Sequence, residues 1–570
     1  MKTFQIDTNR FELEYYSVLQ HHALLADTQN LFGEIGRGAG KSTHIMTPRI
    51  ERVTYDMKRS ISLLLCATYT SLLDNIIPAM TEYLNKNYRR GIHYEYGKKP
   101  PSHFLLPYRD VPDWKRTLSF AWGSVVRFGS IDRPESILGS DFVHVFTDEL
   151  LRIKETAFVE RVLPTLRGNR TLFGNSPYYG GITGTSSTPN FENDYDWWLA
   201  QEQNTNRELI DYIMSIALRV HHAKYYEKTS ESAKEIEKYR RFIKRWEERL
   251  VECRQGQTTY LKGSSFTNLA VLGLEYITNQ YKGSAANIEK FNLSILGIRP
   301  KKVGEMFFGR FGKQHIYTDS YDYGNIDSID RHLFEEKGSS IIADGHSKTS
   351  LDLKYCDPNK PIIAGFDPGH FMSIVFAQEN TKYGKAELRV FKNMYVTHPE
   401  QHFELAQKIA LFFKNHKRKK IFLYYDRAAN QRKKVYENNQ SGKTDARILQ
   451  KHLKDLGWEA ELKDLGRETI YHKLHYILLN ILFGERQSNT PRIKICQYEC
   501  EELVSSIYMS PLKRLGGEIF LDKSSEDKLD LEDQALWSTQ IATSLMYMLY
   551  GLYQKYMPGD TIEYSHYSGL

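Results

Sequence analysis

A glycine-rich segment near the start of the chain has the residue types that hold nucleotide phosphates. From Gly33 to Thr43 it reads Gly-Glu-Ile-Gly-Arg-Gly-Ala-Gly-Lys-Ser-Thr. Glycines let successive backbone N–H groups turn toward an anion, and a helix beginning near Lys41 would add its positive end. Lys41 is expected to reach the β- and γ-phosphates of ATP, and Ser42 to bind Mg²⁺. The predicted nucleotide-binding residues are Gly36, Arg37, Gly38, Ala39, Gly40, Lys41, Ser42, Thr43 and Asp148.

The segment departs from the usual Walker A motif at one position. The pattern G-x-x-x-x-G-K-[ST] requires a glycine at Ile35, and here the glycine comes one residue later. A chance glycine-rich turn is therefore the alternative. Arg37 is predicted to act on the γ-phosphate as an internal arginine finger, with an exposed loop arginine as the alternative. Gln29, just before the first strand, could contact the adenine base.

Two acids that suit ATP hydrolysis end an apolar run at residues 142–147. Asp148 would hold the metal through water, and Glu149 would polarise the attacking water. A strand ending in Asp-Glu is common, so this pair indicates an ATPase site only in combination with the glycine loop. Residues 170–177 are predicted to form a further strand beside the acid strand, with small polar residues that sense the γ-phosphate. With a strand at 60–68, these elements predict a parallel sheet with the nucleotide at its carboxyl edge.

A second set of carboxylates lies in the last third of the chain. Asp367 follows the apolar run 361–366, Asp426 follows the run 420–425, and Asp530 and Asp533 share one face of a helix predicted to begin at 528. Several carboxylates around two Mg²⁺ or Mn²⁺ ions can cleave a phosphodiester bond. The predicted catalytic acids are Asp367, Asp426 and Asp533, with Asp530 as a further metal ligand; Asp522, Glu526, Asp527 and Glu532 are nearby alternatives.

The elements between these acids follow a recognisable order. Predicted strands at 373–378 and 387–396 form a hairpin, and a helix is expected at 399–415. A strand ending in Asp, a hairpin, a second strand ending in Asp and a helix carrying Asp is the order of ribonuclease H-like folds. Taken singly, a strand-end turn explains Asp367 and helix capping explains Asp530 or Asp533.

Composition limits the class of protein. The 570 residues are 41% apolar and 26% charged, with a net charge of +7, so the chain is folded and permits a nucleic-acid partner without requiring one. No run reaches about 18 apolar residues, so no membrane span is expected. Charges near the N-terminus argue against secretion, and five cysteines fit a reducing cytoplasm.

We expect four parts along the chain: an ATPase domain at 1–220, a lid or linker at 221–355, a nuclease domain at 356–545 and a tyrosine-rich tail at 546–570. The charged segment 230–253 has apolar residues every three to four positions, which predicts one amphipathic helix. It is either a surface helix packed on a domain or a mobile, DNA-facing arm. The tail either packs as a final helix or docks on a partner.

Together these motifs resemble the large terminase subunits of tailed bacteriophages, over residues 25–180 and 355–545. The resemblance is carried by the variant Walker A at Gly36–Ser42, by Ile137–Gly139 leading into 142–149, by Gly174-Asn175-Ser176, by Gly365–Gly369 and by Asp530-x-x-Asp533-x-Ala535. The family usually has histidine at the position of Asp530. With aspartate at this position, the motif is more similar to that of the Holliday-junction resolvases, which share this fold. The replacement leaves open how metal binding is divided between Asp530 and Asp533.

The resemblance implies an α/β chain with a P-loop, ASCE-type ATPase domain on a parallel sheet, followed by a ribonuclease H-like nuclease domain on a mixed sheet. It also implies a motor that moves double-stranded DNA into a procapsid and an endonuclease that cuts concatemeric DNA. The implied partners are a portal protein, a small terminase subunit and other copies in a ring, usually a pentamer. The implied location is the cytoplasm of an infected bacterium, with transient binding to the procapsid.

Two other functions fit the same motifs. One is a helicase-like ATPase fused to a resolvase-type nuclease that serves recombination. The other is a DNA-binding scaffold whose nuclease is inactive.

Overall fold

The chain divides into two compact units, and each is considered by itself. The computed structural model describes residues 15–189, 197–283, 291–298, 305–369, 371–382, 385–430, 444–465, 470–485, 490–516, 518–524, 526, 534–535 and 538–557. The first unit comprises Met1–Tyr281, Glu289–Lys301 and Asp330–His346, and the second comprises Lys282–Ile288, Lys302–Ile329 and Ser347–Leu570. Among the described helices, none is long and apolar enough to cross a membrane.

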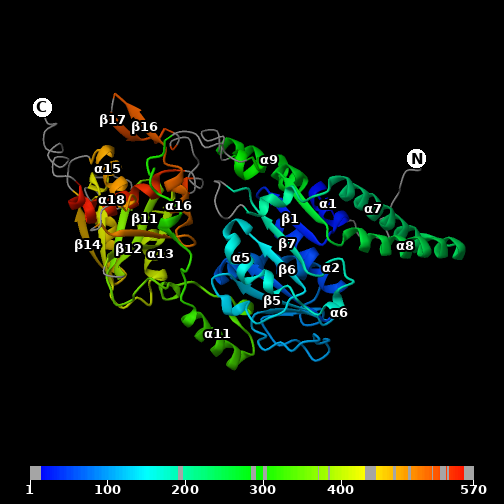
Figure 1. Ribbon diagram of the computed structural model, residues 1–570. Coiled ribbons are helices and arrows are strands. Elements are labelled where there is room, and N and C mark those ends of the chain that lie inside the picture. Colours follow the sequence, from blue (N-terminus) through cyan, green and yellow to red (C-terminus); the bar gives the residue numbers. More distant parts are fainter. Residues whose placement is uncertain are drawn as a thin grey trace. The chain divides into compact units, whose positions relative to one another are not determined.

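The first unit is built on an eight-stranded sheet (Figure 1). Its strands, in spatial order, are β3 (Tyr94–Tyr96), β4 (Thr117–Phe120), β5 (Val125–Ser130), β2 (Ile61–Cys66), β6 (His144–Asp148), β7 (Gly181–Ser186), β1 (Asn30–Ile35) and β8 (Thr258–Gly263). The strands from β5 to β8 are parallel, and β3 and β4 are antiparallel at one edge. One strand, β7, separates β1 from the acid strand β6, and this order defines an ASCE-type ATPase fold.

Buried apolar strands explain why this sheet forms. Every residue of β2 is buried, as expected for a parallel strand covered on both faces. The helices of the first unit are α1 (Val18–Ala26), α2 (Thr47–Asp56), α3 (Tyr69–Ser71), α4 (Ile77–Asn87), α5 (Glu155–Arg161), α6 (Arg170–Phe173), α7 (Arg207–Thr229), α8 (Ala233–Arg254), α9 (Leu269–Gly283) and α12 (Ile341–Asp344). Helix α11 (Tyr323–Lys337) contributes residues to both units, and the last two residues of α9 belong to the second.

The predicted strand at 170–177 is wrong. Residues 170–173 form the short helix α6, because the Asn169 side chain accepts a hydrogen bond from the N–H of Leu172 and caps its first turn. The strand beside β6 is β7, eleven residues further on, and it pairs with both β6 and β1. The small polar residues at the nucleotide edge are therefore those that end β7.

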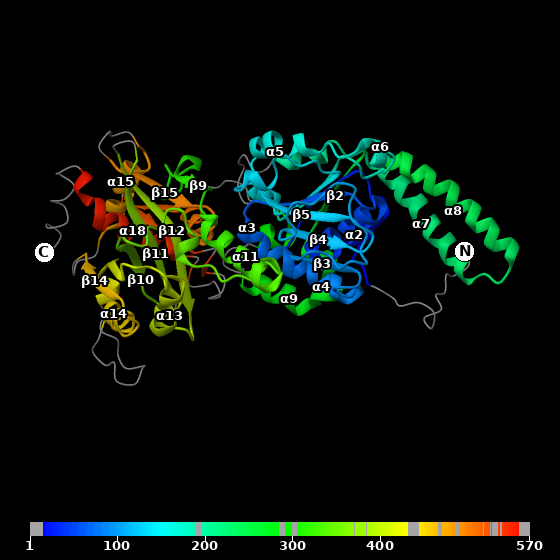
Figure 2. The ribbon, with the colours of Figure 1, turned by 90° about the horizontal axis from the view of Figure 1, so that it is seen from below.

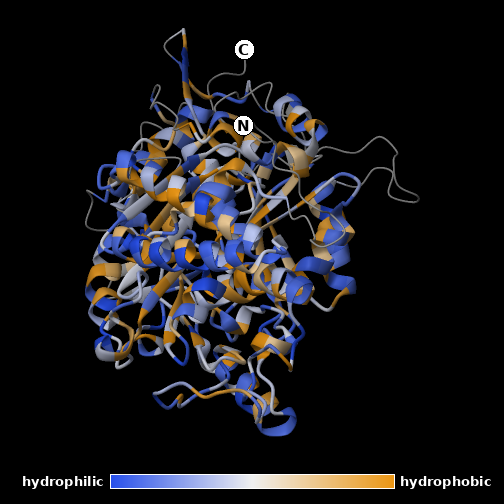
Figure 3. Cartoon of the chain, turned by 90° about the vertical axis from the view of Figure 1, so that its right-hand side faces the viewer, coloured by the Kyte–Doolittle hydropathy of each residue, from blue (hydrophilic) through white to orange (hydrophobic). Residues whose placement is uncertain are grey.

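The predicted helix at 230–253 is confirmed as α8, which lies antiparallel beside α7 (Figure 2). The contact between the two helices is formed by buried apolar side chains, among them Ile213, Val220, Ile243 and Leu250. The same cluster includes residues of α1, on which the pair packs. Figure 3 views the chain from the side on which this pair lies in Figure 1, and many of the helical turns seen from there are hydrophilic. The described residues of the expected lid region, 221–355, are shared between the two units.

The second unit is built on a seven-stranded mixed sheet. Its strands, in spatial order, are β14 (Glu459–Asp464), β13 (Lys420–Tyr425), β10 (Ile362–Asp367), β11 (Phe371–Lys382), β12 (Lys385–Thr397), β15 (Arg492–Cys496) and β9 (Ile316–Tyr317). Strand β11 is antiparallel to β10 and β12, and the other pairs are parallel. Hairpin β10–β11–β12 with β13 and β14 on the far side of β10 is the ribonuclease H-like order, so the predicted fold class is confirmed.

Helices cover this sheet, and the last of them contains the first part of the predicted tail. They are α13 (His402–Phe412), α14 (Asp445–Asp455), α15 (His472–Leu482), α16 (Glu501–Tyr508) and α18 (Gln540–Tyr553); β16 (Leu512–Leu515) and β17 (Glu518–Leu521) form a separate hairpin. Helix α18 packs directly on β10. The approach is so close that a Cβ at Gly365 would collide with the backbone of Ser544, which explains the glycine in this strand. Tyr547 and Tyr553 are buried there, whereas residues 558–570 lie outside the described residues.

Candidate functional site

The glycine loop joins β1 to a helical segment that begins with η1 (Lys41–Met46) and continues as α2. Gly38 and Gly40 both have φ of 77°, a left-handed conformation that side chains rarely adopt. A Cβ at Gly36 would lie 2.8 Å from the backbone nitrogen of Ser265, and one at Gly40 would lie 2.5 Å from Nε2 of Gln20. The backbone therefore requires glycine at all three positions.

Three side chains from distant parts of the first unit hold this loop by its carbonyl groups. Gln20 Nε2 donates to the carbonyl of Ala39 at 3.1 Å, and Ser265 Oγ donates to that of Arg37 at 2.6 Å. Asn268 Nδ2 donates to the carbonyl of Gly38 at 2.9 Å. These three residues escape prediction, because no spacing in the sequence links α1 or the segment after β8 to the loop.

Lys41 lies where β1 and β7 end. Its Nζ donates to the carbonyl of Ile35 at 3.0 Å and to Ser187 Oγ at 3.1 Å. Burial lowers the pKa of Lys41, and the negative charge of Asp148 opposes that shift. Ile35 is the last residue of β1 and is buried, so the turn begins at Gly36. This explains why the first glycine comes one position late.

Asp148 brings the glycine loop and the acid strand together. Ser42 Oγ donates to Asp148 Oδ2 at 2.6 Å, and Thr185 Oγ1 donates to Oδ1 at 2.7 Å. The backbone N–H of Glu149 also donates to Oδ1, at 3.0 Å. A hydroxyl and a carboxylate in contact are the hard oxygen donors that Mg²⁺ prefers, so the residues present fit this ion.

Glu149 has an unusual backbone. Its φ of 59° is left-handed, which costs a non-glycine residue free energy and is often found at functional sites. Its carboxylate forms an ion pair with Arg152 Nε at 3.1 Å. Arg37 is exposed on the loop, and its γ-phosphate role stays a prediction.

Gln29 lies at the start of β1, the opposite end from the loop. Its side chain donates to the carbonyl of Tyr179 and accepts from the N–H of Gly256. A strand of this length spans about 20 Å, so Gln29 is far from a base bound beside the loop.

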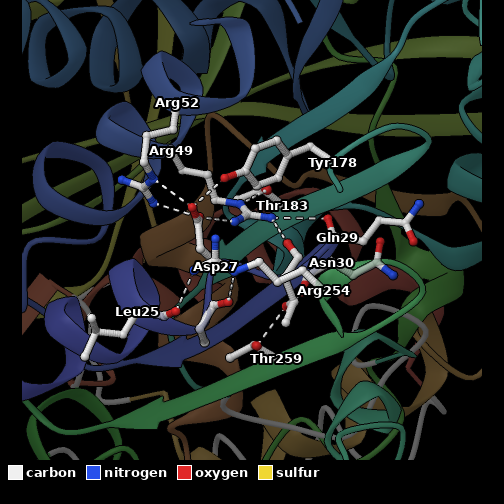
Figure 4. Close-up of polar contacts among 12 residues, drawn as sticks. Leu25, Asp27, Gln29, Asn30, Arg49, Arg52, Tyr178, Thr183, Arg254 and Thr259 are labelled. Carbon is white, nitrogen blue, oxygen red and sulfur yellow. Dashed lines mark hydrogen bonds and ion pairs between the residues drawn. The ribbon is translucent and has the colours of Figure 1, made fainter. Parts of the chain in front are cut away.

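A buried charge network lies at the same end of β1 (Figure 4). Asp27 accepts hydrogen bonds from Arg49 at 2.6 Å, from Arg52 at 2.9 and 3.1 Å and from the hydroxyl of Tyr178 at 2.6 Å. Burial would raise the pKa of Asp27, but Arg52 and Arg49 outweigh it and hold the pKa well below its ordinary value. Arg254, at the end of α8, donates to the carbonyls of Leu25 and Ala26.

Replacing Asp27 with asparagine should destabilise the first unit by about 3–5 kcal/mol, because Arg49 would keep a fully buried charge without its anion. The measurement is urea-induced unfolding of the full chain. Arg52→Gln is the control and should cost less, because the Arg52 side chain is 26% exposed. A change below about 1 kcal/mol in Asp27→Asn would contradict this account of the network.

Asp367 and Asp426 lie at one edge of the second sheet. Asp367 is the last residue of β10, and Asp426 directly follows β13. These two strands are adjacent and parallel, so both carboxylates lie at the carboxyl ends of the strands. Burial raises the pKa of Asp367 to about 7; Lys523 lowers it, and the charges of Asp426 and Glu526 raise it further. The Tyr547 hydroxyl from α18 hydrogen-bonds Asp426. Two carboxylates at one edge supply oxygen donors suited to Mg²⁺ or Mn²⁺.

The other predicted ligands, Asp530 and Asp533, lie outside the described residues. Within the residues that are described, no group of three or more His, Cys, Asp or Glu side chains could hold a metal ion. Glu526, one of the alternative acids, is buried and accepts from the backbone N–H of Thr539 at 2.7 Å and from Gln540 Nε2 at 3.3 Å. It therefore caps α18 while its charge acts on Asp367.

The raised pKa of Asp367 predicts a pH-dependent stability. A carboxyl with a pKa of about 7 in the folded chain and 3.8 when unfolded stabilises the fold at low pH, and this contribution is lost between pH 4 and 7. In EDTA, Asp367→Asn should therefore gain up to about 4 kcal/mol over the wild type at pH 8, and little at pH 4. Denaturant unfolding at both pH values measures it, with the exposed Asp464→Asn as control. Parallel pH profiles for wild type and Asp367→Asn would refute the expectation.

No protein-family model matches the chain, and no curated protein matches it. Among solved structures it is similar to the large terminase of a thermophilic bacteriophage, with 12% identity and a TM-score of 0.34 over 94% of this chain and 99% of that chain. The same protein in complex with ATP-gamma-S aligns with 11% identity, a TM-score of 0.34 and the same coverage. The large terminase ATPase domain of Thermus phage P74-26 aligns with 13% identity and a TM-score of 0.29, over 51% of this chain and 95% of that domain. Identities and TM-scores this low carry nothing about activity.

Proposed function

We propose that this chain is the motor and nuclease subunit of a viral DNA-packaging machine. It couples ATP hydrolysis to the movement of double-stranded DNA into a procapsid and cuts concatemeric DNA with a two-metal endonuclease. One observation carries the proposal: a single chain joins an ASCE-order sheet, where Ser42 contacts Asp148, to a ribonuclease H-order sheet with Asp367 and Asp426 at one edge.

In the ATPase unit, the glycine loop and Lys41 bind the β- and γ-phosphates of ATP. Ser42 and Asp148 would hold Mg²⁺, which would supply charge neutralisation at those phosphates. Glu149 orients the attacking water and accepts its proton, and Arg37 stabilises charge on the γ-phosphate. Thr185 keeps the Asp148 carboxylate in place through its hydrogen bond to Oδ1. Ser187, directly after β7, accepts a hydrogen bond from Lys41 and takes the γ-phosphate-sensing position predicted for the segment 170–177.

In the nuclease unit, Asp367, Asp426, Asp530 and Asp533 would hold two Mg²⁺ or Mn²⁺ ions, which would supply an activated water and charge for the leaving oxygen. The Tyr547 hydroxyl orients the carboxylate of Asp426. Lys523, whose charge acts on Asp367, adds positive charge where a DNA phosphate would lie.

The proposed partners are double-stranded DNA, a portal protein, a small terminase subunit and other copies of this chain in a ring, a pentamer by resemblance. The proposed location is the cytoplasm of an infected bacterium, with transient docking on the procapsid.

A packaging assay with procapsids that carry the cognate portal tests the function. We expect ATP-dependent protection of DNA from nuclease inside the heads. A helicase-like enzyme of recombination would unwind or resolve DNA in the same mixture and leave the heads empty, and that result would overturn the proposal.

A further inference from the structure

We propose that the outer face of α8 binds the phosphate backbone of double-stranded DNA. This inference rests on the proposed function, because it names the surface through which the ATPase unit grips its substrate. The alternative is a solvent-exposed surface helix that binds no ligand.

The outer face of α8 carries a basic row formed by Lys234, Lys238, Arg241 and Arg245. The spacing of four, three and four residues aligns these side chains on one side of the helix, and all four are exposed. The opposite side holds the buried Ile243 and Leu250 against α7. The row is therefore presented away from the body of the unit.

Most ion pairs of the acids on α7 and α8 are made outside this row, although Glu237, Glu248 and Glu252 lie on its side of the helix. Glu227 on α7 pairs with Arg240 at 2.9 Å, and Glu247 pairs across the interface with Lys224 at 2.6 Å. Within the row, Arg241 has one long ion pair, with Glu237 at 3.8 Å. Among the residues that the structure describes, Lys234, Lys238 and Arg245 form no ion pair.

The dimensions of the basic row suit a DNA backbone. From Lys234 to Arg245 the helix rises about 16 Å, which covers roughly five phosphates of one strand at 3.4 Å each. Lysine and arginine on a straight helix contact phosphates regardless of base sequence, as a motor that moves along DNA requires. The charge complementarity favours a duplex over an apolar partner.

The pair of helices α7 and α8 is joined to the glycine loop by short connections. Arg254, the last residue of α8, binds the carbonyls of Leu25 and Ala26, and β8 begins four residues later. Strand β8 pairs with β1 along its whole length, and the N–H of Gly36 donates to the carbonyl of Gly263 at 2.9 Å. DNA held by α8 is thus linked through the edge strand β8 to the glycine loop.

The test compares two triple variants of the full chain. K234Q/K238Q/R245Q removes the unpaired members of the row, and K414Q/K417Q/R418Q removes three exposed charges before β13 in the second unit. Both lower the net charge by three, and glutamine preserves helix propensity in α8. Fluorescence anisotropy with a labelled 30-base-pair random duplex is measured across a NaCl series, alongside circular dichroism and ATP turnover.

We expect the α8 variant to bind the duplex at least tenfold more weakly and to lose up to about 2.7 from its salt slope, while the control matches the wild type. Basal ATP turnover should be unchanged, and its stimulation by DNA should fall. Unchanged duplex binding, or an equal loss in the control, overturns the inference and leaves the proposed function standing. Lost procapsid docking with normal duplex binding assigns the face to a protein and also overturns it. A wild type that binds no duplex overturns both.

Discussion

Replacing Glu149 with alanine should abolish ATP turnover while leaving nucleotide binding intact. The residues proposed to hold the phosphates and Mg²⁺ are on the glycine loop and at Asp148, and the backbone N–H of Glu149 donates to the Asp148 carboxylate. Alanine keeps the N–H and removes the carboxylate that would polarise water. Loss of a general base costs about 10²–10⁴-fold in rate.

Phosphate release measures the turnover of Glu149→Ala, and a fluorescent ATP analogue measures its binding. Glu155→Ala is the matched control, since it removes an exposed acid from the first turn of α5, six residues along the chain. Turnover at the wild-type rate in Glu149→Ala would remove this residue from the mechanism. Loss of nucleotide binding would instead assign Glu149 a structural role through its left-handed backbone.

Asp367→Ala should reduce Mn²⁺-dependent nicking of a supercoiled plasmid to background. Asp367 is buried at the carboxyl end of β10, and the other residues of this strand carry no side chain that could bind a metal ion. Removing even an outer partner of a metal ligand costs 10–100-fold, so loss of a direct ligand should exceed about 100-fold.

The control for Asp367→Ala is Asp464→Ala, which removes an exposed acid from the end of β14 at the same sheet. It should nick normally. Asp367→Ala should keep wild-type ATP turnover, because its site belongs to the second unit. Nicking by Asp367→Ala at the wild-type rate would refute the nuclease assignment, whereas a wild type that never nicks would favour an inactive scaffold.

Strands with continuous apolar sequence could be predicted from the chain alone. The runs that became β2, β6 and β10 are apolar because these strands are buried along their whole length, whereas β13 alternates buried and half-buried positions. Acids stand where β6, β10 and β13 end. These strands located both candidate sites in outline. Helix α8 could also be predicted from the sequence, because its single apolar stripe matches the helical repeat.

Strand β7 could not be predicted in the same way. Its sequence, Gly-Ile-Thr-Gly-Thr-Ser, is polar and contains two glycines, which are features of a turn. It is a buried strand because its hydroxyl groups find partners far away in sequence: Thr183 accepts from Arg49 Nε at 2.7 Å, and Thr185 donates to Asp148. Local sequence patterns carry no record of such distant partners, and the same holds for Gln20, Ser265 and Asn268 around the glycine loop.

The position of β1 also has a consequence for synthesis of the chain. This strand leaves the ribosome early, yet its neighbours in the sheet are β7 and β8, which end at residues 186 and 263. Until both have been translated, both edges of β1 lack their native pairing, and the glycine loop lacks the contacts from Ser265 and Asn268. Contacts this far apart in sequence fold slowly. The catalytic loop encoded first is therefore among the last parts of its unit to become competent, and a nascent chain shorter than about 260 residues holds no finished nucleotide site.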